Sequence, residues 1–172
     1  TKQDFPFVIT GDITVFRWDW SYHNDPVSVT LTIEPGAVVR FLALSDDQSA
    51  GANSSRSELI VKGSLLAAGT EAAPIVFTSS SANPAKGDWY GIRVLTNAAN
   101  GAVTLSHCTV EYSSLGVDVR ATTFSAAVTI TNSTISDNFA YWSGGGIHNR
   151  GTVTIINSTV SGNSADGIFS TG

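Results

Sequence analysis

The sequence contains no methionine and a single cysteine, Cys108, among its 172 residues. One cysteine cannot form a disulfide within the chain, so the cysteine content says little about the compartment. Because no cationic neighbourhood is evident around Cys108, we expect a small residue in a turn or in the core rather than a reactive thiol. The absence of methionine, even at position 1, suggests a processed chain or one domain of a longer protein.

Charged residues are also scarce, at 13% of the chain, and the nine Lys and Arg are outnumbered by 14 Asp and Glu, giving a formal net charge of -5. No basic stripe is available to meet phosphate groups, so we expect no nucleic-acid partner. No apolar run approaches the roughly 18 residues of a membrane-spanning helix, so no membrane span is expected. The hydrophobic content of 42% is sufficient for the core of one domain.

A repeat of 25 residues is the strongest pattern in the chain. Residues 128–138 read VTITNSTISDN, residues 153–163 read VTIINSTVSGN, and a weaker copy, VTLSHCTVEY, occupies residues 103–112. A period of this length is typical of a solenoid, in which each turn buries its apolar face against the next. Apolar β-branched residues alternate within each copy, which indicates short strands rather than helices. The repeat therefore predicts a parallel β-helix.

The first half of the chain follows the same plan with other corners. Residues 31–41 read LTIEPGAVVRF, residues 59–69 read LIVKGSLLAAG, and residues 74–79 read PIVFTS. Pro35 and Gly36 suit a type II bend between two strands. A second ladder pairs a glycine with a β-branched residue at Gly91-Ile92, Gly116-Val117, Gly146-Ile147 and Gly167-Ile168. Polar stretches at residues 45–57 and 80–87 read as loops extruded from one flank, where binding sites usually lie.

These first-half motifs, together with DWYGI at residues 88–92, resemble secreted bacterial right-handed parallel β-helix repeat proteins. The second half, with GGGIHNRGTVTIINSTVSGNSA at residues 144–165, is similar to repeats of large bacterial surface proteins and polymorphic outer-membrane proteins. The resemblance covers about residues 28–170 and implies a secreted or cell-surface location. Its motifs are core and corner residues, so it implies the fold and hardly any chemistry.

We therefore predict an all-β fold: a single-stranded right-handed parallel β-helix with an aromatic cap at residues 1–28 and about five or six turns over residues 29–172. The cap would cover the exposed strand edges of the first turn with large aromatic side chains. An alternative is that Trp18, Trp20 and Tyr22 form a platform on which sugars stack, and Trp142 is a further glycan-binding candidate. We expect the following side chains to point into the core: Leu31, Ile33, Val38, Leu59, Val61, Leu65, Ile75, Phe77, Ile92, Val94, Val103, Leu105, Val110, Val117, Val128, Ile130, Ile135, Ile147, Val153, Ile155, Val160 and Ile168.

Two pairs of asparagines recur at equivalent corners, Asn132 with Asn157 and Asn138 with Asn163. We interpret them as structural ladders whose side chains satisfy backbone groups at the bends. Asn53-Ser-Ser in an exposed loop is the most accessible of three glycosylation sequons.

Catalysis would require charged side chains on successive turns. Arg93, Asp118 and His148 each stand two places after a ladder glycine, so they should point outward and stack about 4.8 Å apart, with Arg120 nearby. Glycoside hydrolysis would need two carboxylates that face one sugar from opposite sides of a groove. Calcium-dependent lyase chemistry would need acidic residues that bind Ca²⁺ and a lysine or arginine that acts as the base. The recurring motifs of pectin hydrolases and pectate lyases are missing. We interpret the column as a solvated face and expect neither catalysis nor a metal; Ca²⁺ enters only under a lyase reading.

Two classes of function remain. The first is a structural or adhesive module, secreted or on the cell surface, that could also bind a glycan. The second is a polysaccharide lyase or glycoside hydrolase, or a fragment of one. The repeat is still running at residue 170, so either the chain continues or subunits stack head to tail into a filament through the open last turn.

Overall fold

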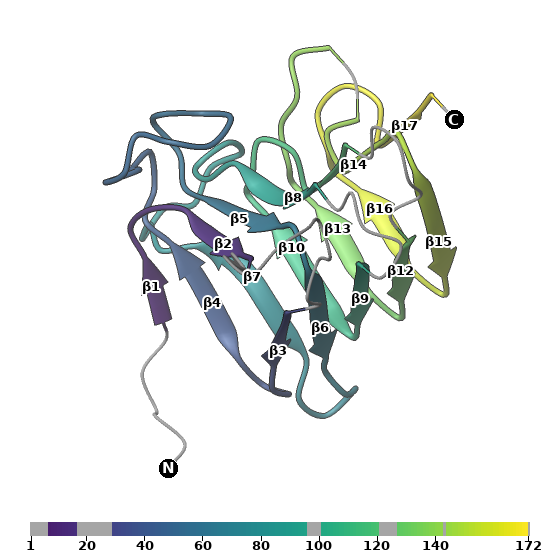
Figure 1. Ribbon diagram of the computed structural model, residues 1–172. Helices are drawn as coiled ribbons and strands as arrows, with labels where there is room; N and C mark the ends of the chain where they lie inside the picture. The colour runs from purple at the N-terminus through teal and green to yellow at the C-terminus, as the bar shows by residue number, and fades with distance from the viewer. Residues whose placement is uncertain (1–6, 17–28, 96–100, 121–126, 143, 172) are drawn as a thin grey trace, which may run out of the picture.

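The computed structural model describes residues 7–16, 29–95, 101–120, 127–142 and 144–171. Every regular element in these ranges is a β-strand, and the strands stack in parallel on successive turns (Figure 1). The predicted all-β parallel β-helix is confirmed. The candidate residues Trp18, Trp20 and Tyr22 lie outside the described residues.

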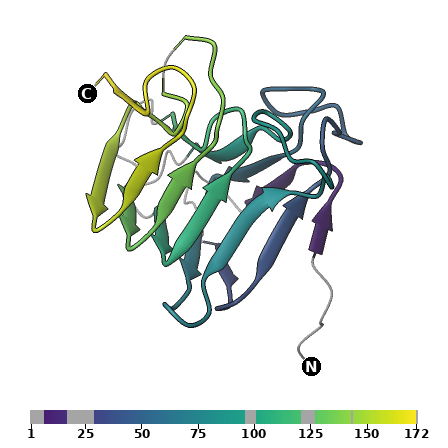
Figure 2. The ribbon, with the colours of Figure 1, turned by 180° about the vertical axis from the view of Figure 1, so that it is seen from behind.

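The strands form three parallel sheets, which the chain visits in rotation. Sheet A contains, in spatial order, β1 (Phe7–Ile9), β4 (Val38–Phe41), β7 (Ile75–Ser79), β10 (Cys108–Glu111), β13 (Thr134–Ser136) and β16 (Thr159–Ser161). Sheet B contains β2 (Ile13–Val15), β5 (Glu58–Val61), β8 (Gly91–Val94), β11 (Val117–Val119), β14 (Ile147–Asn149) and β17 (Ile168–Ser170). Sheet C contains β3 (Thr30–Ile33), β6 (Ser64–Ala68), β9 (Ala102–Ser106), β12 (Ala127–Thr131) and β15 (Thr152–Ile156). Figure 2 shows the strands of sheet A side by side from β1 to β16.

The β-helix begins earlier than the sequence suggested. β1 pairs in register with β4, and β2 pairs in register with β5, so residues 7–15 already belong to the first turn. The boundary predicted at residue 28 is therefore too late. Both Ile13 and Val15 are β-branched, but only Val15 is buried, at 5% exposure, whereas Ile13 in this first turn is 38% exposed.

The 25-residue repeat fixes the register of the later turns. Val128 pairs with Val103 and Val153, and Ile130 pairs with Leu105 and Ile155. The inward side chains stack into columns along the interior, and most of the predicted set is buried. Leu31, Ile33, Val153 and Val160 are partly buried and pack against the core, whereas the remaining three members differ from the prediction. Val38 is half-buried because Val39 and Phe41 face inward instead, a shift of one residue after the Pro35-Gly36 bend.

The other two exceptions are Ile155 and Ile168, whose exposed fractions are 36% and 47%. Both lie in the last described turn, where no further described turn covers them. Val153 and Val160 of the same turn are partly buried against the core. Head-to-tail stacking through this turn remains a prediction.

An aromatic pair anchors the first half of the core. The rings of Phe41 and Trp89 stack with their centroids 4.0 Å apart and planes 2° from parallel, and both side chains are fully buried. Nε1 of Trp89 donates a hydrogen bond to the carbonyl oxygen of Glu111 at 2.8 Å. This contact joins the loop before β8 to sheet A, so it fixes the flank on which the longest connections lie.

Candidate functional site

The connections from sheet A to sheet B form one flank of the molecule. They comprise residues 10–12, 42–57, 80–90, 112–116, 137–146 and 162–167, so all of them leave the carboxyl ends of sheet A strands. The longer ones rise at the same end of the stacked sheets (Figure 1). Loops from four successive turns surround a groove of about 570 Å³ over the outer face of sheet B. The groove is lined by Asn53, Arg56, Lys86, Gly87, Tyr90, Ser114, Leu115, Arg120, Phe139, Ala140, Tyr141, Trp142, His148 and Arg150.

Cationic and aromatic side chains dominate this lining. Its basic side chains are Arg56, Lys86, Arg120, His148 and Arg150, and its aromatic residues are Tyr90, Phe139, Tyr141 and Trp142. No aspartate or glutamate belongs to the set of described residues that line the groove. A chain with a net charge of -5 thus gathers four arginine or lysine side chains at one concave site.

Two arginines lie side by side at one end of the groove. Arg120 and Arg150 directly follow Val119 and Asn149, which pair between β11 and β14. Neighbouring parallel strands are about 4.8 Å apart, so the two cations start from adjacent positions. The exposed Arg150 side chain forms no hydrogen bond or ion pair with a described residue. Arg120 is paired with Asp118, so Arg150 carries the positive charge of the two that has no partner among the described residues.

Asp118 lies behind these cations at the centre of a polar cluster. Its Oδ1 accepts hydrogen bonds from Nε of Arg120 at 2.7 Å and pairs with Nδ1 of His148 at 3.0 Å. Nε of Arg120 is also 2.9 Å from Oδ2 of Asp118. Because a carboxylate can only accept, Nδ1 of His148 is the donor in this contact, which makes Nε2 the acceptor in the neutral form of the imidazole. The ring of Phe169 from the next turn stacks on His148 with a centroid separation of 5.5 Å.

The predicted stacking of Arg93, Asp118 and His148 on successive turns is confirmed by the register of β8, β11 and β14. Their predicted solvent exposure is wrong. Asp118 is fully buried, His148 is 6% exposed, and the side chain of Arg93 is 22% exposed. These residues do point away from the core, but the A-to-B loops and neighbouring long side chains cover this face of sheet B.

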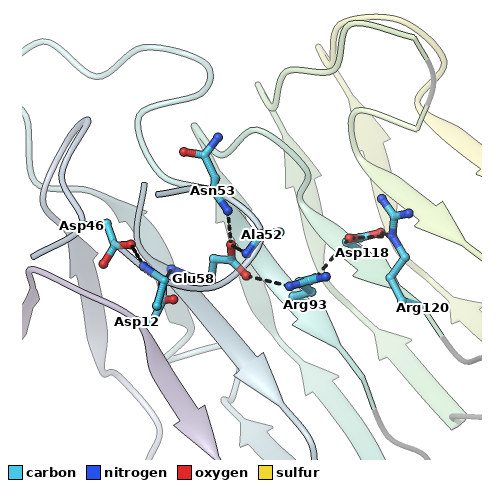
Figure 3. A network of polar contacts seen from close by, with 9 residues as sticks. Asp12, Asp46, Ala52, Asn53, Glu58, Arg93, Asp118 and Arg120 are labelled. Carbon is cyan, nitrogen blue, oxygen red and sulfur yellow. Dashed lines mark hydrogen bonds and ion pairs between the residues drawn. The ribbon is translucent and has the colours of Figure 1, made fainter. Parts of the chain in front are cut away.

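The buried polar network continues toward the first turns through Glu58 (Figure 3). Arg93 Nη1 lies 3.3 Å from Oε2 of Glu58, and Arg93 Nε lies 4.0 Å from Oδ2 of Asp118. Arg93 therefore links two fully buried carboxylates. Oε1 of Glu58 accepts hydrogen bonds from the backbone N–H groups of Ala52 at 2.5 Å and Asn53 at 2.9 Å.

Glu58 was not singled out in the sequence, although a signal was present. In the pairing of β5 with β8, Glu58 occupies the position opposite the ladder glycine Gly91. Asp12 stands directly before Ile13, which pairs with Leu59, so it holds the same position one turn earlier. The ladder thus begins with two acidic residues where later turns have glycine. A side chain at this position points away from the core and must be held by partners on that face.

Burial raises the pKa of several groups in and near the site. Desolvation raises the pKa of Glu58 despite the opposing hydrogen bonds from Ala52 and Asn53. Desolvation likewise raises the pKa of Asp12, against one backbone hydrogen bond from Glu58. The pKa of Tyr90 is raised mainly by burial and further by the negative charge of Asp118. Away from the groove, burial raises the pKa of Cys108 to about 11, which leaves its thiol protonated and unreactive.

The asparagine ladders divide into two kinds. Asn138 is fully buried: its Oδ1 accepts the N–H of Ser113 at 2.9 Å, and its Nδ2 donates to the carbonyl of Val110 at 3.1 Å. Nδ2 of Asn138 also donates to Oδ1 of Asn163 at 3.0 Å, which extends the ladder by one turn. Asn138 and Asn163 therefore satisfy backbone and side-chain groups at the bends.

Asn132 and Asn157 do not form a side-chain ladder of this kind. Both are exposed and have positive φ angles of 49° and 47°. Asparagine tolerates this left-handed conformation better than most residues. The adjacent serines provide the side-chain bonds instead: the hydroxyl of Ser158 accepts the N–H of Ser133 at 3.1 Å. The sequence interpretation was wrong about which side chains bond at this corner, because the asparagines act there through the backbone.

Two other predicted residues reach the groove. Trp142 is 93% exposed at its rim, and Asn53 is half-buried in the loop before β5. Oδ1 of Asn53 accepts the N–H of Ser55 at 2.9 Å, which folds the sequon into a turn. Glycosylation of Asn53 remains a prediction.

Among the described residues, no group of three or more His, Cys, Asp or Glu side chains could hold a metal ion, and no helix is long and apolar enough to cross a membrane.

Comparison with known families agrees with this architecture. A family model described as "Pectate-lyase like beta helix domain" matches residues 26–120, which include β3 to β11 and the first three of the four A-to-B loops of the groove. Comparison with curated proteins and with solved structures found no match.

Proposed function

The chain belongs to the pectate-lyase-like β-helix domain family, and we propose that it is a secreted or cell-surface adhesive module whose groove binds an acidic polysaccharide. The observation that carries this proposal is the composition of the groove, with four arginine or lysine side chains, one histidine, four aromatic side chains and no carboxylate in its described lining. The groove is also one continuous feature over four turns, so it suits an extended ligand.

Charge selects the chemical class of the ligand. Guanidinium groups bind carboxylate and sulfate groups through paired N–H donors, and these bonds are stronger than neutral ones. Nε of Arg120 donates to Asp118, whereas the two terminal nitrogens of Arg120 form no hydrogen bond with a described residue. Together with Arg150, which has no partner among the described residues, these nitrogens can hold a sugar carboxylate or sulfate.

The aromatic side chains select a sugar rather than a bare anion. Trp142 and Tyr141 are 93% and 84% exposed, and Tyr141 packs edge-to-face on Phe139 with a centroid distance of 4.7 Å. Large exposed aromatic residues beside a groove are unfavourable in water and mark a binding surface. They can cover the apolar face of a sugar ring while the arginines hold its acidic group.

Affinity electrophoresis tests the proposal with three polymers: a uronate polymer, a sulfated glycan and neutral dextran. We expect retardation by one or both acidic polymers and none by dextran, with affinity falling as salt is added. Arg150→Ala and Trp142→Ala should each weaken binding about tenfold or more without lowering the melting temperature. Arg40→Ala is the matched control, because Arg40 is exposed on sheet A outside the groove. Equal retardation by dextran, or an equal loss in the Arg40 variant, would contradict the proposal.

A second candidate function, polysaccharide lyase activity, is favoured by the Asp118–His148 pair beside Tyr90. In this reaction His148 Nε2 would remove the proton next to the carboxyl group of a uronate. The electron pair would form a carbon–carbon double bond and expel the glycosidic oxygen, which would take a proton from Tyr90. Arg120 and Arg150 would neutralise the carboxylate during proton removal.

The lyase candidate is tested by the ultraviolet absorbance of the unsaturated product, measured with and without Ca²⁺. Product formation that is lost in His148→Gln but kept in Arg40→Ala would establish the activity. Tight binding of the acidic polymer without any unsaturated product would leave the adhesive function and exclude the lyase.

A further inference from the structure

The loop that brings Asn53 and Arg56 to the groove rests on two buried acidic residues, Asp12 and Glu58. Asp12 is 9% exposed and Glu58 is fully buried. Oδ1 of Asp12 accepts the backbone N–H of Glu58 at 2.8 Å, so the two residues are joined across adjacent turns. The carboxylate of Glu58 in turn holds the loop through the N–H groups of Ala52 and Asn53.

The two carboxyl groups converge on one point beside Gly51. A Cβ atom at Gly51 would lie 2.5 Å from Oδ2 of Asp12 and 2.7 Å from Oε1 of Glu58. Gly51 has a φ of 66°, and only a residue without a side chain fits there. The loop backbone therefore closes directly over both acids.

The charges around this point do not balance. Asp46 and Asp47 on the loop add negative charge beside Asp12, and the positive side chain that acts on both Asp12 and Glu58 is Arg93. Arg93 is committed to Glu58 at 3.3 Å and is shared with Asp118. Two buried carboxylates close together, with one shared cation among the described residues, cannot both ionise without a large cost.

The hydrogen bonds decide which acid carries the proton. Both oxygens of Glu58 have donors, two backbone N–H groups and Arg93, which favours the carboxylate. Oδ2 of Asp12 is buried and has no hydrogen-bond partner among the described residues. A buried carboxylate oxygen without a donor is costly, whereas a neutral carboxyl group is much less so.

We propose that Asp12 holds a proton on Oδ2 when the 42–57 loop is closed over Glu58, and that this proton keeps the loop in place. Loss of the proton loosens the loop and weakens ligand binding in the groove. Asp12 is then a positioning residue that acts through Glu58 and makes the groove sensitive to pH. The effect on ligand binding rests on the proposed function, but the effect on the loop does not.

The direction of the pH effect follows from linkage. Opening the loop returns Asp12 to water, where an aspartate has a pKa of about 3.9, whereas the pKa in the closed state is raised by burial. The closed loop is therefore most stable below about pH 4 and loses stability as the pH rises through the raised value. Between about pH 4 and the raised pKa of Asp12, the population of open loops grows by up to about tenfold per pH unit, and above that pKa it levels off.

Hydrogen exchange of the full chain measures this directly, with protection factors of the Ala52 and Asn53 amides compared from about pH 4 to pH 9. We expect the protection of both amides to fall with rising pH in the wild type and to stay nearly constant in Asp12→Asn, whose amide nitrogen replaces the protonated oxygen without titrating. Asp47→Asn is the matched control: it also removes one negative charge, but Asp47 is exposed and bonds Thr10. It should keep most of the fall.

Wild-type protection that does not change with pH, or an equal fall in Asp12→Asn, would overturn the proposal. If Asp12→Asn does not fold, infrared spectroscopy of the wild type decides. With isotope-labelled aspartate carboxyl groups, a protonated aspartate band at about pH 6, where an ordinary aspartate is about 99% ionised, supports the proposal, and its absence overturns it. Binding of the acidic polymer is then measured separately: a closed loop without binding would refute the proposed function and leave the proton on Asp12 intact.

Discussion

The carboxylate of Asp118 accepts a hydrogen bond from Nδ1 of His148 at 3.0 Å, across two adjacent turns of the β-helix. The same carboxylate binds Nε of Arg120 through both of its oxygens. Asp118 therefore does two things at once: it fixes the orientation of the histidine and holds one arginine at the groove.

Asp118→Asn should destabilise the protein strongly, because Arg120 would lose its buried counter-charge and Arg93 would keep only Glu58. Breaking such a pair from one side costs about 3–5 kcal/mol. Urea unfolding would measure the change. Asp137→Asn is the control: Asp137 is 47% exposed and lies 3.9 Å from Lys86, so its loss should cost less than about 1 kcal/mol. Similar losses for both variants would contradict the buried network.

The two asparagine ladders should respond differently to truncation. Asn138→Ala would leave the N–H of Ser113 and the carbonyl of Val110 without the partners described above, at a cost of about 1–3 kcal/mol for each unpaired group. Thermal and urea unfolding would both report this loss.

Asn157 offers a comparison at a different kind of corner. Asn157→Gly should be nearly neutral and Asn157→Ala should cost about 1 kcal/mol, because the position has a left-handed backbone. An equal effect of glycine and alanine at Asn157 would show that its side chain, and not its backbone, matters.

Cys108 should be inert in the folded protein. Its pKa of about 11 leaves about one thiol in a thousand ionised at about pH 8, and the residue is 2% exposed. Reaction with a thiol reagent should therefore be slow and should rise with urea along the unfolding curve. Rapid reaction under native conditions would contradict the buried position.

The Phe41–Trp89 stack should be the most sensitive apolar contact tested by a single truncation. Phe41→Ala would leave a cavity beside a fully buried indole, and such changes cost about 3–5 kcal/mol. Leu66→Ala provides the comparison, because Leu66 is 40% exposed on the outer face of sheet C. We expect a loss of about 1 kcal/mol or less there, measured by the same unfolding curves.

Much of the fold could be predicted from the sequence because, in a parallel β-helix, the sequence repeat corresponds to the register of neighbouring strands. The match of Val128 with Val153 at an offset of 25 residues is also their pairing in sheet C. The column of Arg93, Asp118 and His148 followed from the glycine ladder in the same way. Periodicity thus specifies which residues share a face and which turns are neighbours.

The burial of that column could not be predicted, because the loops that cover it do not repeat. Residues 42–57 and 137–146 have no common pattern, and their approach to sheet B depends on contacts such as that of Glu58 with Ala52. Val38 was assigned to the wrong face because the Pro35-Gly36 bend resets the alternation by one residue. Both differences arise where the chain leaves the repeat.

The placement of every A-to-B connection on one flank has a consequence for how such a protein changes over evolutionary time. The connection between β10 and β11 has five residues, whereas that between β4 and β5 has sixteen, yet the strands on either side keep the same parallel pairing. Insertions and deletions in this flank can therefore accumulate without disturbing the stacked interior. Lineages that share the scaffold can diverge in ligand preference through these segments alone, and an engineer could exchange one segment at a time.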